Sequence, residues 1–160
     1  LARFVDNPNG LRTTLHLSQS LISGSFIIDF LDPHDTFVPN NLDIYVPHGY
    51  HLRLVQYLRQ VKHYAFAEDA IWPPYTLEFG VEKIIDIIQS ATQTALYPLA
   101  FFWTTAVMNY LTADGFCCAY PELMLHRRSL LNPTSLLDYY YPPPRILGCI
   151  DKYIHRGFQF

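Results

Sequence analysis

Three polar residues that alternate along a short apolar segment are the first candidates for chemistry. Asn41, Asp43 and Tyr45 occupy every second position of the sequence NNLDIYVP. Because successive side chains of a β-strand point to opposite faces, this spacing places all three on one face. The carboxylate and the amide supply oxygen atoms, which are the ligands that Mg²⁺ prefers. The segment is therefore a candidate for one half of a metal site.

A second candidate carboxylate lies inside the apolar segment KIIDIIQS. Asp86 has isoleucines on both sides, and a carboxylate buried in such a strand is costly unless it is paired or bound to a cation. If the strands that carry Asp43 and Asp86 are neighbours, the two carboxylates can meet. Acids that hold Mg²⁺ beside a nucleotide neutralise its phosphates and activate the attacking oxygen. The pair is consistent with a magnesium site for phosphoryl transfer.

A short glycine-serine segment precedes the first of these strands. Gly24 and Ser25 stand directly before an apolar stretch, Phe26–Leu31, that is expected to be helical. Backbone amides at the start of a helix bind phosphate, and glycine lets a ligand approach them closely. A serine at this position is also typical of an ordinary helix cap. The sequence leaves both interpretations open.

The elements that must position these residues alternate between strand and helix. Strands are expected at Leu42–Val46 and Lys83–Ile88, which are rich in apolar and β-branched residues. Apolar spacing and boundary residues predict helices at Leu11–Gln19, Phe26–Leu31, His51–Val61 and Ile146–His155. Leu96–Leu111 is also expected to be helical, with interruptions near Pro98 and Thr104-Thr105. Phe116–Ala119 is either a strand or the continuation of a helix. This alternation predicts an α/β (α+β) class, with a small mixed β-sheet flanked by helices.

Charge is distributed unevenly along the chain. The formal net charge is −3, residues 63–125 carry one basic and seven acidic side chains, and residues 126–160 carry five basic and two acidic ones. A general nucleic-acid-binding protein needs an excess of positive charge, so the overall balance argues against that class. The basic residues of the last segment either contact phosphates or are ordinary solvated charge; they are His126, Arg127, Arg128, Arg145, Lys152 and Arg156.

Several other classes are disfavoured by the sequence. The uncharged segment Ile87–Ala113 is long enough to cross a bilayer, but its many polar residues make insertion costly, so no membrane helix is expected. The adjacent Cys117 and Cys118 lack the spacing of a zinc site. No signal peptide is recognised, and with only three cysteines an intracellular location, cytoplasmic or nuclear, is expected. His48 and His51 are an alternative metal-binding pair, and aromatic residues such as Phe101 are expected to serve packing.

The order of the motifs resembles a known superfamily. The series ISGS, a helix, NNLDIYVP, a second helix and KIIDIIQS looks like the nucleotidyltransferase fold of the DNA polymerase β superfamily. The later segments AVMNYLTADGFCCAYPELML and KYIHRGFQF resemble a group of uncharacterised fungal proteins that contain such a domain. The resemblance implies a single domain over residues 1–160, with a motif core at about 20–90 and a helical, basic C-terminal part at 91–160.

The resemblance also implies roles for the candidate residues. Gly24 and Ser25 match the pair that binds the triphosphate, and Asp43 and Asp86 match two acids that bind Mg²⁺ during transfer of a nucleoside monophosphate from a nucleoside triphosphate to a hydroxyl. Asn41 stands where the superfamily has the first acid of an Asp-x-Asp pair, which weakens binding of a second ion. The alternative is therefore a non-catalytic module that binds a nucleotide or a protein. The acceptor, including whether it is a nucleic acid, and any protein partner stay open.

Overall fold

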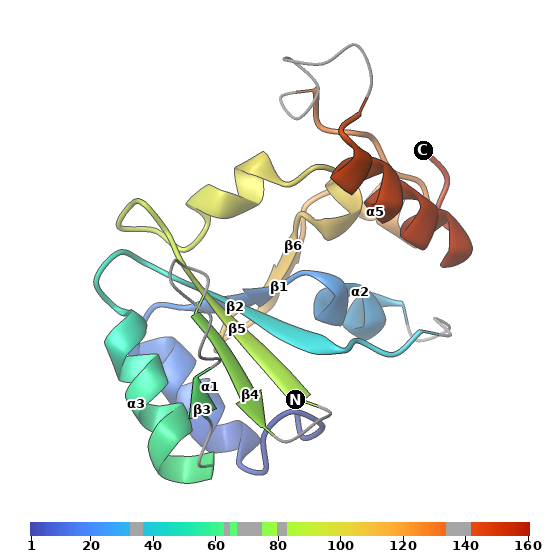
Figure 1. The fold of residues 1–160 in the computed structure, drawn as a ribbon. Coiled ribbons are helices and arrows are strands. Elements are labelled where there is room, and N and C mark those ends of the chain that lie inside the picture. The colour runs from blue at the N-terminus through green and yellow to red at the C-terminus, as the bar shows by residue number, and fades with distance from the viewer. Residues whose placement is uncertain (33–36, 63–64, 67–74, 80–82, 134–141) are drawn as a thin grey trace.

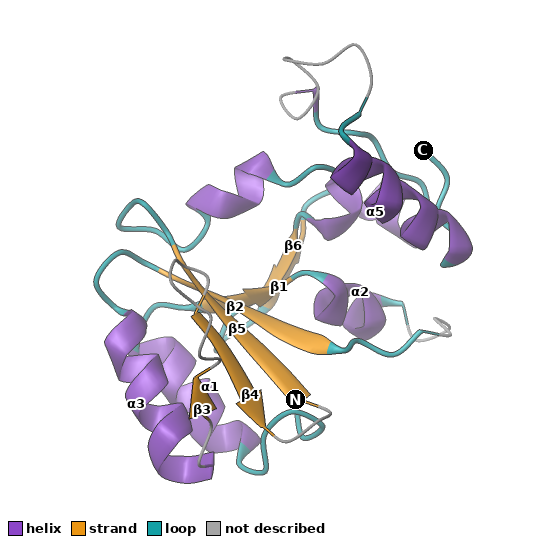
Figure 2. Cartoon of the chain, in the orientation of Figure 1, coloured by secondary structure: helices purple, strands orange, loops and turns teal. Residues whose placement is uncertain are grey.

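The computed structural model describes residues 1–32, 37–62, 65–66, 75–79, 83–133 and 142–160, with the side chains of residues 61–83 left out (Figure 1). The α-helices are α1 Pro8–Leu17, α2 Ser25–Leu31, α3 His51–Lys62, α4 Pro121–Leu125 and α5 Pro144–His155. Two short 3₁₀-helices are η1 Tyr97–Phe101 and η2 Thr105–Val107. The strands, drawn as arrows in Figure 2, are β1 Leu21–Ser23, β2 Asn41–Val46, β3 Ala65–Phe66, β4 Tyr75–Phe79, β5 Lys83–Gln89, β6 Asn109–Leu111 and β7 Phe116–Cys118.

The strands form one mixed sheet, as the sequence predicts. Its order is β3-β4-β5-β2-β1-β6-β7, and β2 and β5 are parallel neighbours at its centre. The other pairs of neighbours are antiparallel. Parallel strands need a long crossover, and here α3 and the β3–β4 pair occupy the chain between β2 and β5. The central pair is therefore fixed from both sides by antiparallel neighbours.

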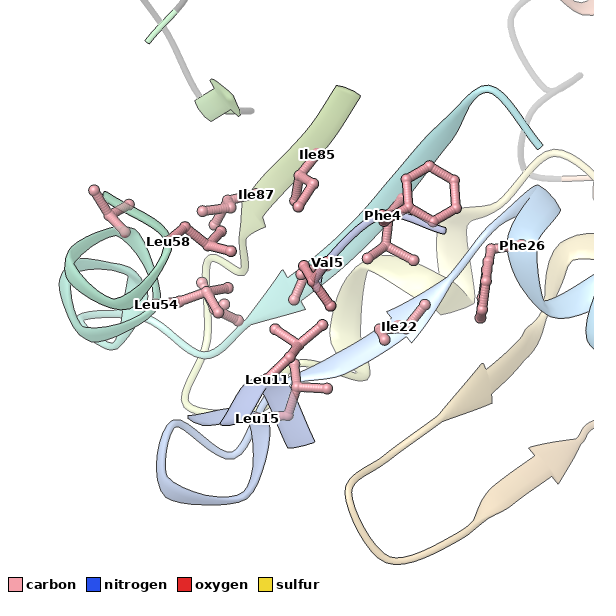
Figure 3. Packing of buried hydrophobic residues seen from close by; sticks show 14 of the residues in the cluster. Phe4, Val5, Leu11, Leu15, Ile22, Phe26, Leu54, Leu58, Ile85 and Ile87 are labelled. Carbon is pink, nitrogen blue, oxygen red and sulfur yellow. The ribbon is translucent and has the colours of Figure 1, made fainter. Parts of the chain in front are cut away.

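The main core lies between one face of the sheet and the helices α1 and α3. Leu11 and Leu15 of α1 and Leu54 and Leu58 of α3 are buried against the isoleucines of β5, among them Ile87 (Figure 3). The helix α1 begins at Asn7, whose side chain accepts a hydrogen bond from the Gly10 amide at 2.9 Å. Figure 1 shows α1 and α3 side by side below the sheet, with α5 well away from them.

A second cluster attaches the C-terminal helix to the rest of the chain. Tyr153 of α5 packs with Ile28 of α2, Val107 of η2 and Phe158 beyond the helix end. The helix α5 ends as predicted, with Gly157 directly after its cap at a φ of 83°. The preceding residues of α2 belong to the main core, so α2 connects the two clusters.

The helix predicted over Leu96–Leu111 is wrong. The chain forms η1 and η2 there, and Asn109–Leu111 is the strand β6, paired with β1 and β7. The reason is that residues distant in sequence provide hydrogen-bond partners for this segment. The hydroxyl of Thr105 exchanges hydrogen bonds with Ser129 and accepts one from the Leu130 amide at 3.0 Å, which holds this segment against the chain that follows α4. The C-terminal part therefore contributes strands as well as helices.

Smaller differences follow from burial and pairing. The sequence analysis assigned no strand to Leu21–Ser23, which is β1, a strand too short to show a pattern. Phe116–Cys118 is a strand, and no described helix is long and apolar enough to cross a membrane. The other predicted helices and strands are confirmed, with ends displaced by up to three residues.

Candidate functional site

The parallel register of β2 and β5 brings the two candidate acids together. Asp43 and Asp86 are direct partners across the two strands, so their side chains leave the sheet on the same face. The two carboxyl groups share a hydrogen bond, which requires a proton on one of them. The juxtaposition proposed from the sequence is therefore present in the structure.

Asn41 lies beside this pair and binds both of its members. Its side-chain nitrogen donates to Asp43 Oδ1 at 2.7 Å and to Asp86 Oδ2 at 2.9 Å. An amide group carries two N–H bonds, so one amide nitrogen satisfies both carboxylates at once. Asn41 thus bridges the acids in the way that a small cation would, with partial charges in place of a full one.

Gly24 directly follows the end of β1 and lies against Asp43. Its φ of 76° and ψ of −152° belong to a backbone region that side-chain-bearing residues essentially never adopt. A Cβ at this position would overlap Asp43 Oδ2 and lie 3.2 Å from its Cγ. Glycine is required here because the backbone passes directly against the carboxylate. Ser25 follows as the first residue of α2, so the predicted glycine-serine pair lies beside the acids.

Asp43 and the glycine-serine pair line one cleft of about 730 Å³, and Asp86 lies next to Asp43 on β5 without lining the cleft itself. The sheet side of the cleft is formed by Asn41, Asp43 and Tyr45, the polar face of β2. Its other sides are formed by residues of η1 and the following loop and by α5, namely Phe101, Phe102, Trp103, Val107, Pro143, Arg145, Ile146, Cys149, Lys152 and Tyr153. A concave site that combines apolar walls with a few convergent polar groups is typical of small-molecule binding.

Burial and the neighbouring acid change the protonation of Asp43. The pKa of Asp43 is raised from 3.8 to about 7, chiefly by loss of solvent and then by the charge of Asp86 and a hydrogen bond with it, while Lys152 lowers it. At pH 7 the Asp43 carboxyl therefore carries a proton in about half of the molecules in the absence of a cation. A bound cation favours the ionised form of both acids, so cation binding at this site releases that proton.

Two buried tyrosines complete the polar lining. Burial raises the pKa of Tyr153 to about 12, and burial together with the charge of Asp43 raises the pKa of Tyr45 well above its ordinary value. Both phenols therefore stay neutral at physiological pH. The ring of Tyr45 packs edge-on against Phe102, with centroids 5.6 Å apart, and this contact supports the wall of the cleft.

The donor set fits one Mg²⁺ ion held jointly with a ligand. Mg²⁺ is usually bound by one or two carboxylates together with substrate phosphates. Asp43 and Asp86 supply the carboxylates, and Asn41 can present its oxygen if its amide turns over. No group of three or more His, Cys, Asp or Glu side chains suited to a metal ion is found among the described residues. The alternative His48–His51 pair has no third ligand of these types there.

No family model and no curated protein matches the chain by sequence. Solved structures do match. A CCA-adding enzyme in complex with ATP superposes with a TM-score of 0.73 at 15% identity, over 95% of this chain and 39% of that one. The Thermotoga maritima CCA-adding enzyme complexed with tRNA gives a TM-score of 0.70 at 17% identity, over 94% of this chain and 38% of that one. A CCA-adding enzyme with CTP gives 0.65 at 18% identity, over 94% and 38%.

This chain has a nucleotidyltransferase-like fold. It spans about two fifths of the length of the CCA-adding enzymes that it matches. Identity at this level establishes the fold alone, so the chemistry of the site has to be argued from its own residues.

The contribution of the C-terminal helix α5 to this site was not predicted from the sequence. Arg145 and Lys152 were grouped with four other basic residues, although the helical spacing of 145, 149 and 152 places these positions on one face of α5. Phe101 was expected to serve packing, yet it lines the cleft and is 56% exposed. The spacing on α5 was a usable signal, whereas nothing local connects residue 101 with Asp43.

Proposed function

We propose that the cleft binds a nucleoside triphosphate together with Mg²⁺ and transfers a nucleoside monophosphate to a hydroxyl acceptor. The observation that carries this proposal is that Asp43 meets Asp86 and Gly24 beside a cleft that Asp43 and Gly24 line, in a nucleotidyltransferase-like fold. The matching CCA-adding enzymes are solved in complexes with ATP, with CTP and with tRNA, which supports a nucleotide as the ligand class.

Each residue has a distinct part in this proposal. Asp43 and Asp86 hold Mg²⁺, which would neutralise phosphate charge and favour the ionised form of the attacking hydroxyl. Gly24 lets the triphosphate approach the backbone, and the hydroxyl and amide of Ser25 donate to its oxygens. The aromatic wall at Phe101 offers a surface on which a base can stack. The whole chain acts as one unit inside the cell, where nucleotides and Mg²⁺ are available.

A second function is favoured by one observation, the amide at position 41. Two-metal transfer needs enough negative charge for both ions, and Asn41 supplies none. Its two hydrogen bonds satisfy the acids in the absence of a second ion. On this alternative the cleft binds a nucleotide or a protein partner without turnover.

Calorimetric titration of the full chain with ATP, CTP, GTP and UTP, with and without Mg²⁺, tests the binding. We expect Mg²⁺-dependent binding that Asp86→Asn weakens by about tenfold or more, because one of the two carboxylate ligands is lost. Asp114→Asn is the matched control, since Asp114 is 70% exposed and pairs with His16 outside the cleft. Binding that is absent, or insensitive to Asp86→Asn, contradicts the proposed site.

A second assay separates the two functions once binding is seen. Wild-type protein is incubated with α-labelled nucleoside triphosphate, Mg²⁺ and oligonucleotide or small-molecule hydroxyl acceptors. Label transferred to an acceptor by the wild type but not by Asp86→Asn supports the transferase. Tight, Mg²⁺-dependent binding without any release of pyrophosphate supports the non-catalytic module.

A further inference from the structure

Two basic side chains near the C-terminus, those of Arg127 and Arg156, make contacts that stabilise the fold. Arg127 donates from Nε to Asp32 at 2.8 Å and from a terminal nitrogen to the Arg156 carbonyl at 3.1 Å. The Arg156 guanidinium lies over the ring of Phe37, 3.5 Å from its centroid. These contacts attach the segment after α4 and the end of α5 to the chain that follows α2. Arg127 and Arg156 are therefore structural residues.

Two cations are placed differently, because they face the cleft. Arg145 and Lys152 lie seven positions apart on α5, with Cys149 between them, and all three residues line the cleft. This spacing keeps them on one face of the helix, over about two turns. Both basic residues are exposed, so a ligand in the cleft can reach them.

The cleft consequently has walls of opposite charge. Asp43 stands on the sheet side of the cleft, and Lys152 and Arg145 stand on its helix side. A cleft with low-dielectric walls concentrates such fields, so an anion that enters is drawn to the helix side. The aromatic residues between the two walls add no charge.

We propose that Lys152 and Arg145 bind the phosphates of a polyphosphate ligand from the side opposite the acids. This inference rests on the proposed function and deepens it, because it says how the site compensates for Asn41. A triphosphate bears more negative charge than one Mg²⁺ ion neutralises, and the acid that would support a second ion is absent. Lysine is a compact charge that binds phosphate well, and arginine binds it with two parallel donors.

The experiment compares ligands that differ only in their phosphates. ATP with Mg²⁺, inorganic tripolyphosphate and adenosine are titrated by calorimetry into the full chain and into Lys152→Met, Lys152→Arg and Arg128→Met. Arg128→Met is the matched control, because Arg128 is exposed in the same part of the chain and does not line the cleft. Circular dichroism and thermal melting show whether each variant keeps its fold.

We expect Lys152→Met to weaken binding of ATP and of tripolyphosphate by about tenfold or more, since a charge-assisted contact is lost. Binding of adenosine stays unchanged, and Lys152→Arg restores most of the affinity. The dependence of tripolyphosphate affinity on salt becomes shallower in Lys152→Met. A purely structural role of Lys152 would not produce this dependence on the phosphates.

Two results overturn the inference and are distinguishable from each other. If ATP binds with Mg²⁺ and depends on Asp86, but Lys152→Met behaves like Arg128→Met, the basic wall is wrong and the proposed function stands. If neither ATP nor tripolyphosphate binds the wild type, the proposed function and this inference fail together.

Discussion

The two faces of strand β2 do opposite things for the molecule. Leu42, Ile44 and Val46 point into the main core and are fully buried among apolar side chains. Asn41 and Asp43 point to the other side, into the cleft. One face of the strand therefore supplies apolar burial, and the other supplies ionisable and amide groups.

The neighbouring strand β5 repeats the contrast and shows what it means energetically. Ile85 and Ile87 are fully buried on the core face, whereas Asp86 stands between them on the cleft face. Burial of each isoleucine stabilises the fold by about 2 kcal/mol. The acid pair works against folding at neutral pH, because one carboxyl is held away from water next to another. The apolar burial on the core face thus offsets the cost of the acid pair on the cleft face.

The strongest challenge to this comparison is Ile44→Ala on the core face. Ile44 is fully buried, so its truncation leaves a cavity and lowers the free energy of unfolding by about 4 kcal/mol. Urea denaturation monitored by circular dichroism measures the change. In conditions where the variant is folded, ligand binding in the cleft is unchanged. A destabilisation below about 1 kcal/mol would contradict the assignment of this face as the core.

Gly24→Ala tests the boundary between the two faces. The new methyl group occupies a backbone region that alanine avoids and collides with Asp43, so we expect a loss of about 3 kcal/mol in the free energy of unfolding. Gly115→Ala is a suitable control, since no atom lies within 4 Å of a Cβ there and its φ is not in the left-handed region. Equal stability of the two variants would show that the backbone at residue 24 is not pressed against the acid.

Asp43→Asn sharpens the comparison by making the cleft face cheaper to fold. Because the pKa of Asp43 is about 7 in the folded chain and 3.8 as a free group, the folded state keeps a proton that the unfolded state has lost between those pH values. Wild-type stability therefore falls as pH rises from about 4 to 7. We expect the variant to be more stable by about 2 kcal/mol at pH 8 and nearly equal at pH 4.

The measurement for this prediction is a series of urea unfolding curves from pH 4 to pH 8, without Mg²⁺. The same variant loses Mg²⁺ binding, so stability and function change in opposite directions. A wild-type stability that rises across this pH window would have the wrong sign and would refute the account of the acid pair.

Asn41→Asp is expected to have the smallest effect, and it acts on cation binding. A third carboxylate strengthens Mg²⁺ binding by about 1 kcal/mol, or about fivefold in affinity. The two hydrogen bonds from the Asn41 amide are lost, so the variant is less stable than wild type without Mg²⁺ and recovers when the ion is added. Calorimetry with MgCl₂ and melting curves at several concentrations measure both changes. An unchanged affinity would mean that position 41 lies outside the cation's reach.

The sequence was most informative where structure is local. The strands β2 and β5 were predicted because their apolar runs and the alternation around Asp43 are visible in a few residues. The helix α3 was predicted too, but the residues on its buried side were not, since Leu54 is buried and Leu52 is 66% exposed. Propensity fixes the element, whereas packing decides which side of it faces the core.

The sequence could not predict the features that depend on contacts between distant segments. The segment of η1, η2 and β6 was expected to be an interrupted helix, but its polar side chains are satisfied by residues after α4, and its end pairs as a strand. The last helix was predicted to begin at Ile146, yet Pro144 is the first residue of α5. The part of α5 in the cleft depends on how the whole chain packs, which no local pattern reveals.

The alternation along β2 and β5 also determines which strand pairing the chain accepts. A slip of one residue would reverse the facing of every side chain in the slipped strand. Asp86 would then enter the space between the sheet and α3, and Ile85 and Ile87 would meet solvent in the cleft. Many isoleucine-rich strands tolerate several alignments, but here a misaligned sheet would bury an unpaired charge. The two acids therefore favour one register of the central strands, independently of any ligand.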